Sequence, residues 1–144
     1  MDELKIMKKK LNCILLVDDE KGANHFHQIM IEEMDYAEKV YLAYDGKEAL
    51  EFLESALAGA LPLPKLIFLD INMPGMNGWD FLHEYEKMDT AIKDKIVVVM
   101  LTSSINHDDM EKAKQFKSVI GFKNKYLEKE AMNELFAEHF PEYF

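Results

Sequence analysis

Five short apolar runs divide this chain at regular intervals, and they restrict its possible folds more than any other feature. Each run is continuously apolar, which is typical of strands in a parallel sheet covered on both faces. A short apolar run alone is equally compatible with a buried helix, so the intervening segments must decide. The runs are residues 13–17, 40–43, 66–69, 96–101 and 119–122.

The segments between these runs have the spacing of amphipathic helices. Apolar residues recur every three to four positions, for example at Ala49, Leu53 and Leu57. Three of the segments begin with a capping residue followed three positions later by an acidic one: Asp45 with Glu48, Asn77 with Asp80, and Asn106 with Asp109. Five strands that alternate with five helices predict a three-layer α/β sandwich with right-handed crossovers.

Composition excludes several classes of protein. The 144 residues are enough for about one domain. There are 17 basic and 27 acidic residues, the formal net charge is −10, and every basic residue is lysine. An acidic chain without arginine is poorly suited to nucleic acid, and we expect no direct binding to it. The single cysteine, Cys13, excludes an internal disulfide and fits a reducing compartment.

The N-terminus imitates a signal peptide, because three lysines precede an apolar run. The run stops at Asp18 and no small-residue cleavage site follows, so we interpret it as a buried strand. No other segment is typical of a membrane span. The sequence therefore predicts a cytoplasmic protein that does not bind membranes.

Polar residues follow four of the five predicted strands. Asp18 and Asp19 come directly after the first, Asp70 after the third and Thr102 after the fourth, and Lys125 lies three residues beyond the last. The carboxyl ends of parallel strands meet at one edge of a sheet, where doubly wound folds bind their ligands. We therefore expect these five side chains to share one site.

Three carboxylates at one site need a positive partner. Two unit charges ~4 Å apart repel by ~4 kcal/mol at an effective dielectric constant near 20. A divalent cation and the lysine ammonium would offset this repulsion, and ligands that are all oxygen select Mg²⁺, with Mn²⁺ tolerated. Mg²⁺ usually shares its coordination sphere with a phosphate oxygen, and a carboxylate of the group could then attack phosphorus to form an acyl phosphate.

Four motifs, each after a predicted strand, give the chain a family resemblance. From residue 12 to residue 140 it resembles the receiver domain of two-component response regulators. The resemblance implies the flavodoxin-like strand order 2-1-3-4-5, for which the chemotaxis member of this family is a standard example. The motifs are LVDDE at 16–20, DINMPGMNG at 70–78, MLTS at 100–103 and GFKNK at 121–125.

The resemblance also implies roles at the acidic end of the site. Asp70 would accept a phosphoryl group from the histidine of a sensor kinase or of a histidine phosphotransfer protein. Asp18 and Asp19 would hold the metal together with Asp70, and the backbone carbonyl of Asn72 would be a further ligand. Such a protein is a phosphoacceptor switch and not an enzyme acting on other substrates.

Lys125, Thr102 and Phe122 resemble the residues that sense the phosphoryl group. Lys125 would pair with it, Thr102 would supply the switch hydroxyl, and Phe122 would be the aromatic side chain whose rotamer follows that hydroxyl. The chain departs from the family at Tyr126, because proline usually follows the lysine. This departure affects the loop into the last helix and the surface offered to partners more than the chemistry at Asp70.

The length of the chain leads us to expect an N-terminal extension (1–11), a receiver domain (12–140), a C-terminal tail (141–144) and no effector domain. Output would then be a contact with a downstream protein or onward transfer of the phosphoryl group to another histidine. Pairing of two phosphorylated copies is a further expectation.

Six lysines lie in the final third of the chain, and we interpret them as a solvated face, with a docking surface for an acidic partner as the alternative. They are Lys112, Lys114, Lys117, Lys123, Lys125 and Lys129.

Two other functions share part of the pattern. Haloacid dehalogenase-type phosphatases also use an aspartyl phosphate, but a second aspartate follows two residues after their nucleophile, where this chain has Asn72. A phosphorylation-independent binding module with the same fold would usually lack part of the acidic set or the lysine.

Two histidines, His25 and His27, resemble a pair of metal ligands in the sequence. Residues two apart on a helix point to nearly opposite faces, so these two cannot share a metal there, and we interpret them as structural or solvent-facing.

Overall fold

Five strands form one parallel sheet in the computed structural model, which describes residues 4–144. The sheet order is β2-β1-β3-β4-β5, as predicted. The chain crosses from β1 to β2 on one side and then returns to β3 on the other, so the carboxyl ends of β1 and β3 flank the point where the winding reverses. The strands are β1 (Leu11–Val17), β2 (Ala37–Ala43), β3 (Leu66–Asp70), β4 (Val97–Thr102) and β5 (Val119–Asn124).

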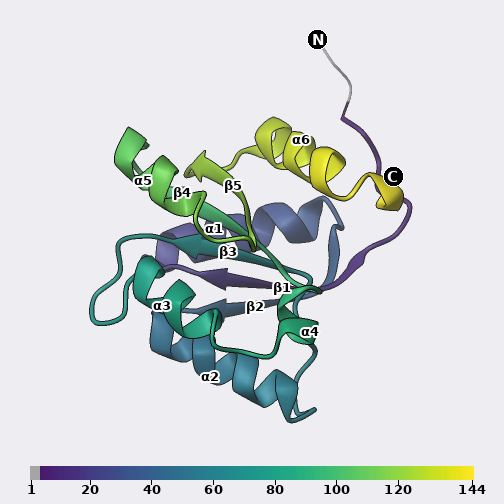
Figure 1. The fold of residues 1–144 in the computed structure, drawn as a ribbon. Coiled ribbons are helices and arrows are strands. Elements are labelled where there is room, and N and C mark those ends of the chain that lie inside the picture. Colours follow the sequence, from purple (N-terminus) through teal and green to yellow (C-terminus); the bar gives the residue numbers. More distant parts are fainter. Residues whose placement is uncertain (1–3) are drawn as a thin grey trace.

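Helices cover both faces of the sheet (Figure 1). On one face lie α1 (Lys21–Glu33) and α6 (Lys129–His139), and on the other lie α2 (Gly46–Leu57), α3 (Gly78–Tyr85) and α5 (His107–Ala113). The side chains of a strand alternate between the two cores. Leu15 and Val17 pack toward α2 and α3, whereas Ile14 and Leu16 pack toward α1 and α6.

The five predicted helices all form, and two short elements accompany them. A one-turn helix, α4 (Thr90–Lys93), precedes β4, and a 3₁₀ turn, η1 (Pro141–Tyr143), follows α6. The Asp89 carboxylate caps α4 by accepting a hydrogen bond of 2.8 Å from the Ala91 N–H. A single turn is too short to show an apolar period, so the sequence pattern does not reveal it. None of the helices within residues 4–144 is long and apolar enough to cross a membrane.

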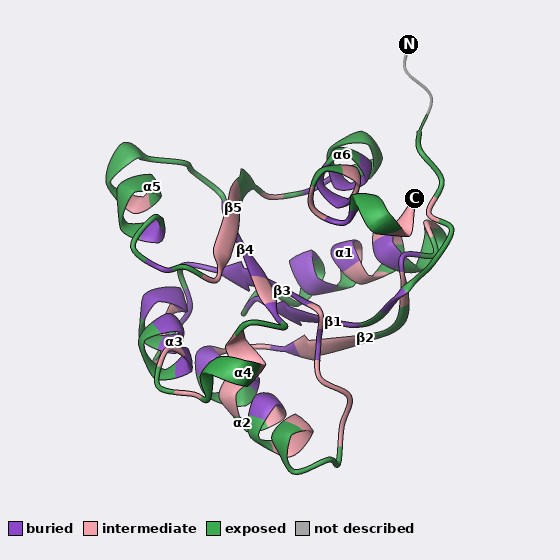
Figure 2. Cartoon of the chain, turned by 45° about the vertical axis from the view of Figure 1, so that its right-hand side comes forward, coloured by how far each residue is buried: buried purple, intermediate pink, exposed green. Residues whose placement is uncertain are grey.

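The five strands differ in burial (Figure 2). All of β3 is buried, and β1 and β4 each have one residue that is not. The edge strands β2 and β5 are partly exposed, so the expectation that all five strands are covered on both faces was wrong for these two. The continuous apolar runs therefore identified strands correctly without separating central strands from edge strands.

All three predicted helix caps form. In each case the capping side chain accepts a hydrogen bond of 2.8–2.9 Å from the backbone N–H three residues later. At α3 the bond is reciprocal, because the acidic side chain accepts from the capping residue's own N–H at 3.2 Å. These contacts satisfy N–H groups that helix starts leave unpaired. The pairs are Asp45 with Glu48, Asn77 with Asp80, and Asn106 with Asp109.

Gly78 allows α3 to begin directly against the end of β3. A Cβ atom at this position would lie 2.6 Å from the carbonyl oxygen of Asp70, closer than real Cβ contacts come. The Gly78 N–H also donates to the carbonyl of Ile71 at 2.9 Å. The turn between β3 and α3 passes through Gly75, whose φ of +72° lies in the left-handed region that favours glycine. The loop beside Asp70 is therefore held tightly by backbone contacts.

Candidate functional site

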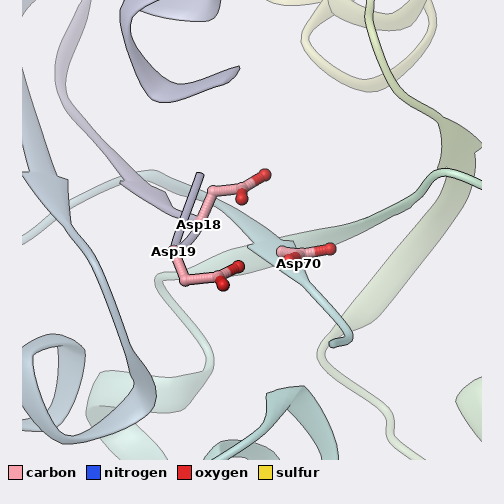
Figure 3. Close-up of side chains that lie close together, drawn as sticks. All are labelled: Asp18, Asp19 and Asp70. Carbon is pink, nitrogen blue, oxygen red and sulfur yellow. The ribbon is translucent and has the colours of Figure 1, made fainter. Parts of the chain in front are cut away.

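The carboxyl ends of β1 and β3 bring three carboxylates together (Figure 3). One oxygen each from Asp18, Asp19 and Asp70 can be chosen so that all lie within 4.8 Å of one another. Val17 and Leu69 are aligned partners in these adjacent parallel strands, so the next residues, Asp18 and Asp70, end side by side. Asp18 and Asp70 are each only 3% exposed, whereas Asp19 is exposed.

Asp18 is fixed by its own loop. The Glu20 N–H donates to Asp18 Oδ1 at 2.9 Å. The side-chain amide of buried Asn24, from the first turns of α1, donates to the carbonyls of Asp18 and Ala43, at 3.1 Å in both cases. Asn24 therefore joins the ends of β1 and β2 to α1 and holds the backbone that carries the acidic pair.

Lys125 reaches the acidic cluster from the residue that follows β5. Its Nζ lies 3.0 Å from Asp18 Oδ2, 3.2 Å from Glu20 Oε1 and 3.5 Å from Asp70 Oδ1. The side chain is 6% exposed. Its backbone N–H donates to the Thr102 carbonyl at 2.9 Å, which joins the ends of β4 and β5.

The remaining predicted residues lie around this cluster. Thr102 is buried at the end of β4, and its hydroxyl donates to the Ser104 carbonyl and accepts from the Ser104 N–H, both at 3.2 Å. Phe122 is half-buried on β5, at the edge of a groove of about 200 Å³ between β5 and α5. Asn72 is exposed, two residues beyond the end of β3. The structure thus gathers the three aspartates and Lys125, whereas Phe122 packs against the core on the α2, α3 and α5 face of the sheet.

A comparison with known families decides what kind of domain this is. The model of the response regulator receiver domain matches residues 14–137, which is most of the chain. The chain belongs to this family. Receiver domains are phosphoacceptor switches whose standard mechanism is phosphorylation of an aspartate. They bind Mg²⁺ at an acidic pocket and interact with histidine kinases or phosphotransfer proteins.

Individual relatives agree with this assignment. The chain is 31% identical over 104 residues to the probable methanogenesis regulatory protein FilR2 of Methanothrix harundinacea, over 69% of this chain and 63% of that protein. It is 35% identical over 98 residues to the response regulator Rcp1 of Synechocystis, over 67% of this chain and 65% of Rcp1. The match thus spans less than two thirds of each curated relative. A two-component response regulator from Cytophaga hutchinsonii superposes with a TM-score of 0.82 at 29% identity, over 90% of this chain and 97% of that one.

The electrostatics of this receiver domain are dominated by burial. Burial and the neighbouring charge of Asp18 raise the pKa of Asp70 to about 7, although Lys125 opposes this shift. Burial also raises the pKa of Asp18. Burial alone would lower the pKa of Lys125, but the hydrogen bond from its ammonium to Asp18 and the charges of Asp18 and Asp70 outweigh it and raise that pKa. One lysine therefore does not fully compensate three carboxylates, and the site has an excess of negative charge.

The acidic cluster fits a hard divalent cation. Its donors are all carboxylate oxygens, which Mg²⁺ prefers, and no histidine or cysteine joins the cluster among the described residues. The raised pKa of Asp70 agrees with this fit. Burial and the charge of Asp18 make this carboxyl hard to ionise, and a bound cation would stabilise its charged form. The cluster is open on one side, through the exposed Asp19.

Three residues of the site region were assigned no role at the site from the sequence. Glu20, quoted within the first motif, contacts Lys125, and the hydroxyl of Tyr126 donates to Glu20 Oε2 at 3.1 Å. The Lys125–Tyr126 peptide bond is cis. His27 is buried, and its Nε2 accepts from the Leu127 N–H at 3.0 Å, whereas His25 is exposed. The tyrosine in place of the usual proline was the only feature of the sequence that pointed to an unusual conformation in this loop.

Proposed function

We propose that Asp70 accepts a phosphoryl group from a phosphohistidine of a sensor kinase or phosphotransfer protein. The observation that carries this proposal is the position of the Asp70 carboxylate, which lies within 4.8 Å of both other carboxylates and 3.5 Å from the Lys125 ammonium. A nucleophilic oxygen, a set of metal ligands and a fixed cation are the parts that phosphoryl transfer to a carboxylate requires. Asp18, Asp19, Asp70 and the backbone carbonyl of Asn72 would hold Mg²⁺, or Mn²⁺ in its place.

In the proposed reaction a carboxylate oxygen of Asp70 attacks phosphorus. The new P–O bond forms as the P–N bond to the histidine breaks, and the imidazole nitrogen keeps the electron pair and takes up a proton. A bound Mg²⁺ would neutralise charge on the phosphoryl oxygens. Lys125 supplies a second positive charge, and Asp18 holds the ammonium of Lys125 in place through the 3.0 Å contact. Hydrolysis of the acyl phosphate later returns Asp70 to its free form.

The proposed switch begins at Thr102. Its hydroxyl is now bonded within its own loop, to Ser104, through two bonds of 3.2 Å. A phosphoryl group on Asp70 offers this hydroxyl a charged acceptor, and hydrogen bonds to charged groups are about twice as strong as neutral ones. Movement of Thr102 toward that acceptor would leave room for Phe122 to turn inward from the groove between β5 and α5.

The proposed partners follow from the family and from the chain's charge. Input comes from a histidine kinase or phosphotransfer protein in the cytoplasm. For the receiver domain at 12–140, flanked by an extension (1–11) and a tail (141–144), we propose output through contact with another protein or onward phosphotransfer. Phosphorylation-dependent pairing of two copies is a third form of output. The formal net charge of −10 and the lack of arginine do not support contact with nucleic acid.

Incubation with Mg²⁺ and acetyl phosphate, followed by intact-mass measurement, tests the proposed phosphoacceptor. We expect an adduct of one phosphoryl mass on the wild type, none on Asp70→Asn, and a much slower reaction when Mg²⁺ is chelated. Asp108→Asn is the matched control, because Asp108 is an exposed residue of the first turn of α5. The absence of an adduct on the wild type, or an adduct that persists on Asp70→Asn, would overturn the proposal.

A further inference from the structure

Lys125 is shared among three carboxylates, and one of them lies outside the metal-binding cluster. The Lys125 Nζ is closer to Asp18 and to Glu20, at 3.0 and 3.2 Å, than to Asp70, at 3.5 Å. The carboxylate of Glu20 comes from the residue just before α1, and its side chain is 56% exposed. The lysine expected to contact the phosphoryl group is therefore held, in this state, mostly by the β1–α1 side of the pocket.

Tyr126 fixes the carboxylate that competes for this lysine. Its hydroxyl donates to Glu20 Oε2 at 3.1 Å, while Glu20 Oε1 accepts from Lys125. The ring of Tyr126 packs edge-on against Phe26, with centroids 5.1 Å apart, and lies 5.6 Å from the ring of His27. The tyrosine is therefore held on α1 in the orientation that directs its hydroxyl at Glu20, although 41% of its surface is exposed.

We propose that Tyr126 is a positioning residue that holds Glu20 against Lys125 and so draws the lysine away from Asp70. This inference rests on the proposed function, because its consequence is for the phosphoryl group on Asp70. When a phosphoryl group arrives, Lys125 must exchange its contact with Glu20 for one with a phosphoryl oxygen. The Tyr126 hydroxyl makes that exchange more costly, and it thereby weakens the phosphorylated arrangement.

The charges of the contact support this direction. The ammonium of Lys125 and the hydroxyl of Tyr126 both stabilise the ionised form of Glu20, and they lower the pKa of that carboxyl. A proline, the usual residue after this lysine in the family, has no hydroxyl with which to hold Glu20. The restraint on Lys125 is thus a property of this chain's own residues. Its size is limited, since Glu20 is half-exposed and exposed ion pairs are weak.

The experiment measures the affinity of the Mg²⁺-loaded chain for beryllofluoride, which mimics a phosphoryl group on the aspartate. Tyr126→Phe removes only the hydroxyl and keeps the ring on Phe26. Glu20→Gln removes only the charge and keeps an acceptor for Tyr126. We expect each variant to bind about two- to five-fold more tightly than the wild type, with the larger effect for Glu20→Gln.

The double variant separates positioning from packing. If Tyr126 acts through Glu20, adding Tyr126→Phe to Glu20→Gln leaves the affinity close to that of Glu20→Gln alone. A tyrosine that acts only by packing would give additive effects or none, and either result overturns the inference, as would weaker binding by Tyr126→Phe. Tyr41→Phe is the matched control, because Tyr41 lies on β2 and packs against Phe52 on the other face of the sheet.

Crystal structures of the unliganded wild type and Tyr126→Phe give a readout that does not depend on phosphoryl chemistry. We expect the Lys125 Nζ to leave Glu20 and approach Asp70 in the variant, and an unchanged position overturns the inference. A wild type that fails to bind beryllofluoride, together with the expected shift of Lys125, would overturn the proposed function alone. Binding by the wild type with no shift would overturn only the role of Tyr126.

Discussion

The β1–β3 side of the pocket and its β4–β5 side differ in burial and in the partners of their polar groups. On the first side, Asp18 and Asp70 are 3% exposed, end two central strands and face each other across the switch point of the sheet. On the second side, β5 is a partly exposed edge strand, and the hydroxyl of Thr102 is bonded to its own loop instead of to the acidic cluster. Lys125 is the residue that crosses between the two sides.

This difference separates the chemistry from its readout. The three aspartates of the acidic side are assembled before any ligand arrives, which favours reaction because these carboxylates need little reorganisation. The β4–β5 side has groups with alternative partners and less packing around them, as expected for an element that moves. Variants on the two sides should therefore differ in kind: those that disturb the acidic side change stability and reactivity, and those on the other side change what phosphorylation does.

The largest effect is expected from Lys125→Met. The substitution leaves Asp18 and Asp70 buried together without their cation, and removing one partner of a buried ion pair costs about 3–5 kcal/mol. The loss in the free energy of unfolding should be greatest near pH 8 and smaller near pH 5, where the remaining carboxylates take up protons and cease to repel each other. Urea denaturation at the two pH values measures both quantities.

Lys123→Met is the control for this prediction. Lys123 lies two residues earlier on β5 and is exposed, so its replacement should change the free energy of unfolding by less than about 0.5 kcal/mol. Equal losses for the two variants would show that Lys125 acts as a surface charge and that the two sides of the pocket are not joined through it.

The acidic side was the more predictable of the two from sequence. Asp18, Asp19 and Asp70 come directly after apolar strands, and the parallel topology requires the ends of such strands to meet at one edge. Nothing comparable locates Glu20 and Tyr126 with respect to Lys125. Their contact depends on the course of a loop and on side-chain rotamers, which leave no periodic signal in the sequence.

The same contrast between local pattern and tertiary context explains which features of the fold the sequence did not predict. Helix α4 is one turn long and held by the cap at Asp89, so no run of apolar positions marks it. The edge strands β2 and β5 have apolar runs like those of the central strands, yet their exposure depends on their place in the sheet order. Local pattern predicted the strands and the caps, whereas burial at the edges depends on the whole sheet.

An intermediate effect, on the pH dependence of the free energy of unfolding, is expected from His27→Gln. His27 joins the β5–α6 loop to α1 by accepting a hydrogen bond from the Leu127 N–H. Burial lowers the pKa of this histidine to about 4, with a smaller contribution from the charge of Lys125. The unfolded chain takes up the proton near pH 6.5 and the folded chain only near pH 4, so stability is full above pH 6.5 and falls as the pH drops between these values. The loss amounts to about 3 kcal/mol.

The acidic side contributes a slope of opposite sign. Because the folded-state pKa of Asp70 is raised, the folded chain binds the proton first, and this group favours folding as the pH falls from about 7 toward 4. The effect of His27→Gln is therefore best measured by comparing the Asp70→Asn variant with the Asp70→Asn/His27→Gln double variant. Urea denaturation between pH 7 and pH 4 gives the free energy of unfolding of each. The glutamine variant should show a flatter profile, and an unchanged slope would mean that the buried imidazole is not its source.

The smallest effect on stability, and the most informative about the switch, is expected from Thr102→Ala. Its hydroxyl makes two neutral bonds of 3.2 Å to Ser104, which is exposed and can bond to water instead, so the free energy of unfolding should fall by only about 1 kcal/mol. Phosphorylation of Asp70 should continue, since Thr102 is not bonded to the acidic cluster. The change that beryllofluoride causes in the NMR signals of the Phe122 ring should disappear. Ser103→Ala, which removes the neighbouring exposed hydroxyl, should retain that change. A change in the Phe122 signals that survives in Thr102→Ala would show that the ring responds independently of the hydroxyl, and it would contradict the switch proposed for the β4–β5 side.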